Sequence, residues 1–142
     1  MNNIDVKKVF KDNEQRFTKA REEMWNLFLQ NPNQHLTIEE IINFLETKEE
    51  INVATTYNNL STFLELNFIN EFIYKNKKYY EYITNNHGHF FCLKCYNLFN
   101  VDIVGLSCLN LEIKQKYGAT VLTNVIEFKG ICNDCQEHDE FN

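Results

Sequence analysis

Proline and long apolar runs are scarce in this chain of 142 residues. Its one proline is Pro32, so few turns can be placed from proline alone. No stretch reaches the roughly 18 consecutive apolar residues that a membrane-spanning helix requires, which predicts a soluble protein with no membrane partner. The first residues lack a basic stretch followed by an apolar core. We therefore expect no secretory signal and a cytoplasmic location.

Basic residues are outnumbered by acidic ones. Fourteen Lys and Arg stand against twenty Asp and Glu, and the formal net charge is -6. Such a balance argues against a polyanionic partner, but it is an average over the whole chain, whereas binding is local. Ten of the fourteen basic residues lie within residues 1–84. The charge count alone therefore does not decide whether nucleic acid is a partner.

The composition changes near the segment Thr84-Asn85-Asn86. All five cysteines and three of the four histidines follow this point. We expect two domains, residues 1–84 and 85–142, and each carries a net charge of -3. The function of the second domain should therefore depend on cysteine and histidine chemistry.

The first half shows helical periodicity. A short helix is expected around Val6–Phe10, and Thr18 can cap a second one. The pattern Thr37-x-x-Glu40 is a capping box that opens a third helix, and Asn52 can cap a fourth. The third helix should be short.

Two strand-like runs, residues 68–74 and 79–83, follow the fourth helix. The segment 75–78 between them predicts a β-hairpin with a basic tip. Three helices followed by a hairpin are typical of a winged helix-turn-helix domain. In that arrangement the exposed face of the last helix enters the major groove of DNA.

The fourth predicted helix has two faces. Its inward stripe is expected to contain Val53, Thr56, Leu60, Phe63 and Leu64. Its outward face is polar and uncharged, with Thr55, Asn58, Asn59 and Thr62. Asn can bind adenine through two hydrogen bonds, and Thr or Tyr can contact thymine methyl groups.

The predicted DNA-binding side chains combine this helix with basic residues that can hold phosphates. They are Arg16, Lys19, Arg21, Thr55, Tyr57, Asn58, Asn59, Lys75, Lys77 and Lys78. The alternative is that the polar face is an ordinary solvated helix surface and that Tyr57 is partly buried.

Two Cys-x-x-Cys pairs dominate the second half. Cys92 and Cys95 form the first, Cys132 and Cys135 the second, and 36 residues separate them. Each pair can present two thiolates from one tight turn, and together they predict a tetrahedral structural zinc site. A reactive dithiol would instead require one pair opening a helix in a βαβ context. The remaining Cys108 is expected to be a buried thiol that acts as a small apolar residue.

His87-Gly-His89 precedes the first cysteine pair. Side chains two apart on a strand point to the same face, so both imidazoles can bind one ion. A zinc deaminase is excluded because the Pro-Cys-x-x-Cys motif is absent. His138, in an acidic tail, is expected to be solvated.

Taken together, these motifs resemble the ferric uptake regulator family. The resemblance covers residues 16–135 and follows the family's order and spacing. The motifs are Arg16-Phe-Thr18-x-x-Arg21, Asn52-Val-Ala-Thr-Thr-Tyr-Asn-Asn-Leu60, Tyr79-Tyr-Glu-Tyr82, His87-Gly-His89-Phe-Phe-Cys92-x-x-Cys95 and Gly130-Ile-Cys132-x-x-Cys135.

The resemblance implies an α+β fold. Its N-terminal winged helix-turn-helix would be followed by a small α/β dimerisation domain with a four-cysteine zinc site. It also implies a cytoplasmic homodimeric repressor, not an enzyme, whose affinity for DNA rises when a regulatory metal binds. The expected DNA partner is an A·T-rich palindromic operator. A protein that buffers zinc without binding DNA is the alternative that the acidic balance suggests.

The resemblance assigns two sets of metal ligands. Cys92, Cys95, Cys132 and Cys135 match the structural Zn²⁺ ligands, and His35, Glu81, His87 and His89 match four regulatory positions. The family's fifth regulatory ligand is a carboxylate, where this chain has Asn100. An amide oxygen lacks the negative charge, so the site should be weaker, and Asp102 on the same strand face is the alternative ligand.

The identity of the regulatory ion stays open at this point. Fe²⁺, Mn²⁺ and Zn²⁺ all suit imidazoles with a carboxylate, and iron is favoured by the resemblance alone. The peroxide-sensing branch of the family is similar in the Tyr57-Asn58-Asn59 run. That branch has aspartates where this chain has Glu81 and Asn100, so oxidation of His35 or His89 is the less favoured mechanism. A zinc-sensing member is the other alternative.

Overall fold

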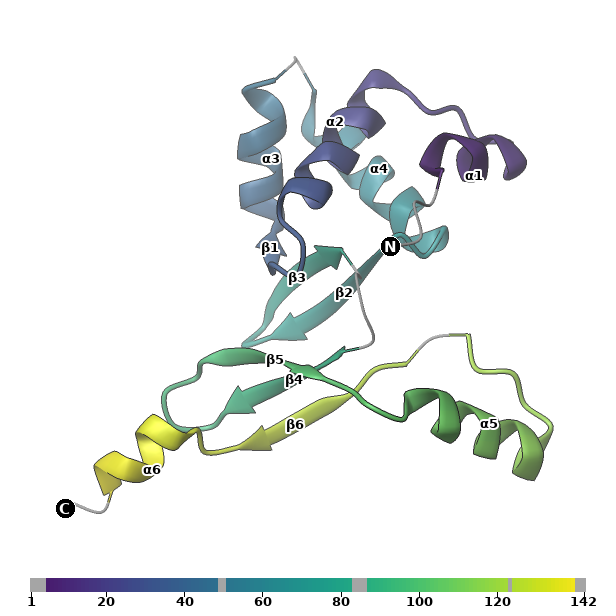
Figure 1. The fold of residues 1–142 in the computed structure, drawn as a ribbon. Coiled ribbons are helices and arrows are strands. Elements are labelled where there is room, and N and C mark those ends of the chain that lie inside the picture. Colours follow the sequence, from purple (N-terminus) through teal and green to yellow (C-terminus); the bar gives the residue numbers. More distant parts are fainter. Residues whose placement is uncertain (1–4, 49–50, 83–86, 123, 140–142) are drawn as a thin grey trace. The chain divides into compact units, whose positions relative to one another are not determined.

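The structure is a computed structural model that describes residues 5–48, 51–82, 87–122 and 124–139. The chain consists of two compact units, Met1–Thr84 and Asn85–Asn142, which are described one at a time (Figure 1). The predicted boundary at Thr84-Asn85-Asn86 and the predicted strand residue Ile83 lie outside the described residues.

The first unit begins with four helices, which match the predicted order. They are α1 (Val6–Asp12), α2 (Lys19–Gln30), α3 (Ile38–Glu46) and α4 (Val53–Glu65). Each predicted N-cap is confirmed, because the side chains of Thr18, Thr37 and Asn52 each accept a hydrogen bond from the backbone N–H three residues on. The capping box is complete, since the Glu40 carboxylate accepts from the Thr37 N–H at 2.7 Å. Local sequence therefore sets where these helices begin.

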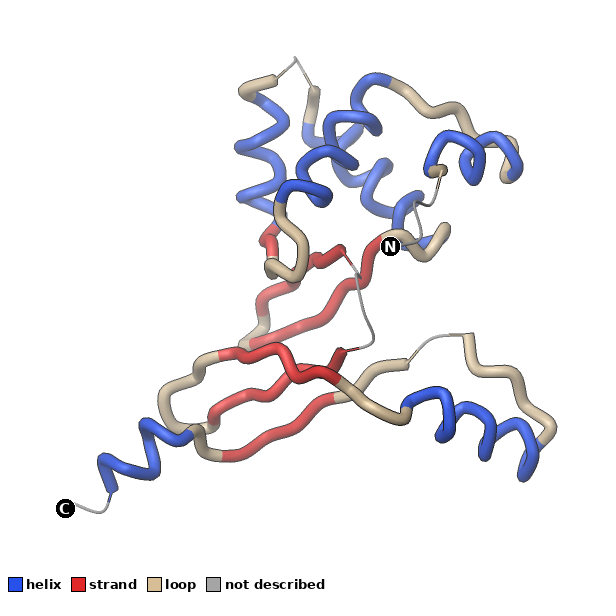
Figure 2. Tube along the Cα trace, in the orientation of Figure 1, coloured by secondary structure: helices blue, strands red, loops and turns tan. Residues whose placement is uncertain are grey.

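The first unit also contains a three-stranded antiparallel sheet, drawn in red in Figure 2. Strands β2 (Ile69–Tyr74) and β3 (Lys77–Tyr82) form the predicted hairpin, and β1 (Leu36–Thr37) pairs with β3. The turn is only Lys75-Asn76, and both residues have positive φ, 50° and 59°. This is the conformation that two-residue hairpins favour. The predicted four-residue tip is therefore wrong, because Lys77 and Lys78 lie within β3.

The core of the first unit is aromatic. Phe10, Phe63, Phe68 and Trp25 pack on one another, with ring centroids 5.2–6.0 Å apart. These rings join α1, α2, α4 and the start of the hairpin, and burying each contributes roughly 1.5–3 kcal/mol. This packing fixes α4 against the hairpin, so the other side of α4 is the one that a ligand can reach.

The second unit is a smaller α/β arrangement. Its sheet contains β4 (His87–Cys92), β5 (Leu98–Asp102) and β6 (Glu127–Gly130), with β4 in the centre. Strand β5 pairs antiparallel and β6 parallel to β4, and α5 (Leu106–Tyr117) lies in the connection from β5 to β6. The short helix α6 (Asn133–Asp139) follows. The predicted fold, a helix-and-hairpin unit followed by an α/β unit, is confirmed.

Two glycines allow the close strand contacts in this sheet. A Cβ at Gly88 would lie 2.9 Å from the carbonyl oxygen of Ile126, and one at Gly130 would lie 3.1 Å from the Phe90 ring. Larger residues would push the central strand away from its neighbours. The glycine between the two histidines therefore has a structural role in β4.

The second unit buries few of its apolar side chains. Of the sixteen exposed large hydrophobic residues among those described, twelve lie in this unit. Helix α5 extends away from the sheet, and Leu109, Leu111 and Tyr117 on it are 53%, 53% and 70% exposed (Figure 1). A unit of this size with so small a core needs additional stabilisation from a metal or a partner. No helix in the described part of the chain has the length and apolar character to cross a membrane.

Candidate metal centres and nucleic-acid interface

The four predicted zinc ligands come together. Cys92 ends β4, Cys95 follows in the turn toward β5, Cys132 follows β6, and Cys135 lies in α6. Their sulfur atoms all lie within 4.8 Å of one another, and Cys95 Sγ and Cys132 Sγ are 3.7 Å apart. A tetrahedral Zn²⁺ with bonds of ~2.3 Å places its sulfur ligands about 3.8 Å apart. The cluster therefore fits a closed structural zinc site.

Backbone hydrogen bonds build the cage. The Tyr96 N–H donates to the Cys92 carbonyl oxygen at 3.0 Å, and Tyr96 has a left-handed φ of 64°. This tight turn brings Cys92 and Cys95 to one side. The Cys132 N–H donates to Cys92 Sγ at 3.3 Å and so connects the two cysteine pairs directly.

The thiols of the cluster differ in acidity. Burial opposes ionisation of Cys92, but N–H groups of Cys132, Cys95 and Lys94 donate to its sulfur and lower its pKa to about 5. Burial, together with the neighbouring cysteine thiols, raises the pKa of Cys135 to about 12. A bound dication would stabilise all four sulfurs as thiolates, so metal binding would release the protons that the thiols retain.

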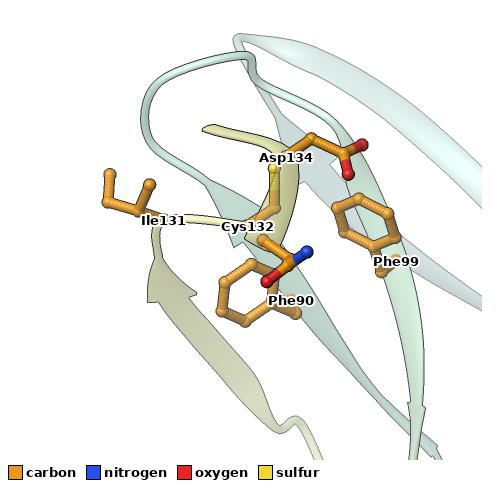
Figure 3. A pocket seen from close by; sticks show the side chains of 6 residues that line it. Phe90, Phe99, Ile131, Cys132 and Asp134 are labelled. Atoms are coloured by element: carbon orange, nitrogen blue, oxygen red, sulfur yellow. The ribbon is translucent and has the colours of Figure 1, made fainter. Parts of the chain in front are cut away.

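An open, mostly apolar depression lies beside the second cysteine pair. Its volume is about 370 Å³, and Figure 3 shows the rings of Phe90 and Phe99 lining it together with Ile131, Cys132 and Asp134. Phe99 is 41% exposed and Ile131 is 37% exposed. The aromatic face of the sheet is therefore only partly covered within the second unit.

The first unit contains two of the predicted regulatory ligands, His35 and Glu81. Leu36 pairs with Tyr80 in the antiparallel β1–β3 ladder, and this register places His35 opposite Glu81. His35 Nε2 lies 3.4 Å from Glu81 Oε2, and the Glu81 side chain is only 2% exposed. A buried carboxylate is costly unless cations or hydrogen-bond donors compensate it. An imidazole beside a buried carboxylate is a donor set that a divalent ion can use.

The second unit contains the other predicted regulatory ligands. His87 and His89 lie on β4 with ring centroids 5.2 Å apart, so the predicted strand and the shared face are both present. In the antiparallel ladder with β5, His87 lies opposite Asp102 and His89 lies opposite Asn100. Four potential ligands therefore occupy adjacent positions on one sheet face.

The exposed face of α4 differs from the prediction, most clearly at Val53 and Asn59. Thr56, Leu60 and Phe63 are buried as expected, but Val53 is 46% exposed and Asn59 only 5% exposed. The predicted base contact through Asn59 is therefore corrected, since its side chain lies under the helix. The exposed stripe contains Val53, Ala54, Tyr57, Asn58 and Ser61, while Thr55 and Thr62 are half-buried.

Arg21 explains why Asn59 is buried. Its guanidinium donates to Asn59 Oδ1 at 3.1 Å, to Thr62 Oγ1 at 3.2 Å and to the carbonyl oxygen of Arg16. The same group lies 5.2 Å from the centroid of the Phe10 ring. Arg21, predicted to bind phosphate, thus connects α2, α4 and the preceding loop in this structure. The helix spacing did not reveal this pairing, because the partners are 38 residues apart.

The Arg21→Met variant is expected to lose about 1–3 kcal/mol of stability, because buried Asn59 Oδ1 loses its charged donor. The matched variant Arg16→Gln changes an exposed side chain and should leave stability unchanged. Urea unfolding of both variants measures the difference. Equal stability in the two would show that the Arg21 hydrogen bonds contribute little.

The other predicted DNA-binding residues are exposed, except for the half-buried Thr55. Arg16, Lys19, Tyr57, Asn58, Lys75, Lys77 and Lys78 are exposed. Tyr57 is 49% exposed, so partial burial does not remove it from the surface. Lys78 Nζ forms an ion pair with Glu71 at 3.3 Å, both on the hairpin. These basic groups and the exposed stripe of α4 belong to the same unit and form its candidate DNA-binding surface.

The structure also tests the predicted burial of Cys108 and the predicted exposure of His138. Cys108 is exposed on α5, so the expectation of a buried thiol is wrong. The neighbouring leucines predicted burial, but α5 packs few of them within its own unit. His138 is exposed, as expected.

Comparison with known proteins gives a consistent result. The profile of the ferric uptake regulator family matches residues 12–129. The ferric uptake regulation protein of Haemophilus influenzae is 29% identical over 130 residues, which cover 89% of each chain. The peroxide operon regulator of Bacillus subtilis is 28% identical over 114 residues, 79% of each chain. The ferric uptake regulator structure from Vibrio cholerae aligns with a TM-score of 0.62 and 25% identity, covering 90% of this chain and all of the other.

Proposed function

The chain belongs to the ferric uptake regulator family, and from this premise we propose that it is a metal-responsive DNA-binding repressor rather than an enzyme. The observation that carries the proposal is the combination of a four-cysteine cage in one unit with a helix-and-hairpin surface in the other. The family match, residues 12–129, includes α2 to α4, the hairpin and the first cysteine pair. We place its action in the cytoplasm, where its DNA partner would be.

Two ions are proposed, with different roles. Structural Zn²⁺ is assigned to Cys92, Cys95, Cys132 and Cys135, and the sulfur spacing supports this. The regulatory ion is assigned to His35 and Glu81 from the first unit and to His87 and His89 from the second. DNA affinity then depends on how much more tightly the ion binds the DNA-competent arrangement.

Iron is the ion that the relatives favour. The Haemophilus relative is named for ferric uptake, and the imidazole and carboxylate donors suit Fe²⁺. Mn²⁺ and Zn²⁺ suit the same donors, and zinc binds tightest to such sites unless its availability is restricted. We propose Fe²⁺ as the regulatory ion, with Mn²⁺ as its air-stable substitute in vitro.

We propose that the second unit forms a homodimer. The exposed apolar residues of α5 and the half-covered Phe90 and Phe99 face are the kind of surface that obligate dimers bury. A dimer would also suit a palindromic, A·T-rich operator, because a two-fold protein axis matches a two-fold DNA site.

The direct test is a titration of labelled operator DNA with zinc-loaded protein, with and without Mn²⁺ or Fe²⁺. Added metal is expected to raise affinity about 5- to 150-fold, the usual range of allosteric coupling. Equal operator affinity with and without metal would show that metal does not regulate DNA binding. An absence of specific binding under both conditions would instead support the zinc-buffering alternative.

Peroxide sensing is the second candidate, because the relative from Bacillus subtilis is a peroxide operon regulator. The chemistry would be iron-catalysed oxidation of His35 or His89. Mass spectrometry of the iron-loaded protein after dilute peroxide separates the two candidates. Addition of one oxygen atom to either histidine, together with loss of DNA binding, would replace the iron-responsive function with the peroxide-responsive one.

A further inference from the structure

We propose that Asp102 supplies the carboxylate ligand of the regulatory site, in place of Asn100. The inference rests on the proposed function, because it concerns the same ion. Its evidence is the register of the β4–β5 ladder, in which His87 pairs with Asp102 and His89 pairs with Asn100.

The register defines a compact array of donors. Residues directly opposite each other in an antiparallel pair share a face, with Cβ atoms about 4.5–5.5 Å apart. Residues two apart along a strand share that face as well. His87, His89, Asn100 and Asp102 therefore form a two-by-two array, with an imidazole and an oxygen donor in each row. The Phe90 and Phe99 pair alternates with it and belongs to the opposite face.

Charge decides between the two oxygen donors. Asn100 offers only a neutral amide oxygen, whereas Asp102 offers an anionic oxygen directly across from an imidazole. Hard divalent ions such as Mn²⁺ and Fe²⁺ favour carboxylate over amide oxygen. Asp102 is exposed, so its side chain can rotate toward an ion without leaving a packed position. A carboxylate at position 102 instead of position 100 therefore still lies on the same face of the sheet as the two histidines.

Glu127 is the competing carboxylate. It lies on β6 opposite His89 in the parallel ladder and is also exposed. It flanks only one imidazole from outside the array, because β6 begins at Glu127 and has no residue opposite His87. Asp102 lies within the array, directly opposite His87 and diagonal to His89. Glu127 is therefore a matched control, an exposed carboxylate on the same sheet.

The test measures Co²⁺ and Mn²⁺ affinity of the full-length, zinc-loaded protein by competition with a chelator, together with the visible absorption of bound Co²⁺. Asp102→Asn is expected to weaken binding at least about tenfold, the lower end of what losing even an outer-shell partner of a metal costs. Asn100→Asp in the Asp102→Asn background should restore affinity. Glu127→Gln should bind as the unaltered protein does.

The outcomes separate the inference from the proposed function. If the zinc-loaded protein binds no second ion, the proposed function fails and the inference fails with it. If it binds Co²⁺ and Asp102→Asn binds equally well with an unchanged spectrum, only the inference is overturned. Weakening by Glu127→Gln alone would assign the carboxylate to β6 instead. Unchanged circular dichroism and zinc content confirm that each variant is folded.

Discussion

Replacing Cys132 with serine is expected to abolish tight zinc binding and to unfold the second unit. Serine keeps the size of the side chain and the backbone N–H that donates to Cys92 Sγ, but removes the thiolate. Structural zinc sites contribute about 10–16 kcal/mol of apparent binding free energy near pH 7. Few apolar side chains are buried in the described part of this unit, so its remaining contacts are too few to offset that loss.

Three measurements check this prediction. Elemental analysis should find the zinc lost, amide exchange should show β4, β5 and β6 losing protection, and sedimentation should show monomer. The matched control is Cys108→Ser, which changes an exposed cysteine of α5 outside the cage. It should retain zinc and fold. A Cys132→Ser protein that still protects the three strands would mean that the sheet does not require the ion.

His89→Ala is expected to remove the response of DNA binding to metal. His89 is buried on the central strand, beside His87 and opposite Asn100, so it contacts the proposed ligand set of the second unit from within the sheet. Its loss should bring operator affinity in the presence of Mn²⁺ down to the metal-free value. That fall equals the coupling of about 5- to 150-fold, or ~1–3 kcal/mol.

Fluorescence anisotropy with operator DNA measures the effect at one salt concentration, because salt alone changes such affinities. His138→Ala serves as the control, since this histidine is exposed in α6, away from β4 in sequence. It should keep the full response. If metal still raised the operator affinity of His89→Ala by the full amount, the regulatory ion would not bind at β4. A uniform loss of binding with and without metal would point to general destabilisation instead.

Local patterns in the sequence predicted the helix starts and the hairpin well, for physical reasons. Thr18, Thr37 and Asn52 are caps whose hydrogen bonds close within three residues, so no distant information is needed. The hairpin prediction erred at its tip, where Lys75 and Asn76 both take positive φ. The pattern marks a turn but does not fix its length. The two-residue strand β1 is too short to show any periodicity.

The net charge of the chain did not decide whether the protein binds DNA. The net charge of -6 argued against a DNA partner, and neither half of the chain is basic. The structure shows that Arg16, Lys19 and the hairpin lysines are exposed, as is the stripe of α4 in the same unit. Few phosphate contacts are available, so we expect weak non-specific binding that depends on dimerisation and metal.

The sequence by itself determined the chemistry of this protein. Two Cys-x-x-Cys pairs predicted the zinc cage, and the ordered motifs predicted the family, because both depend on residue type and short spacing. Only the tertiary structure decided which side chains meet across distance. Asn59 is drawn under α4 by Arg21, and strand register places His35 against Glu81 and Asp102 across from His87. Register and packing depend on the whole core, and no local pattern encodes them.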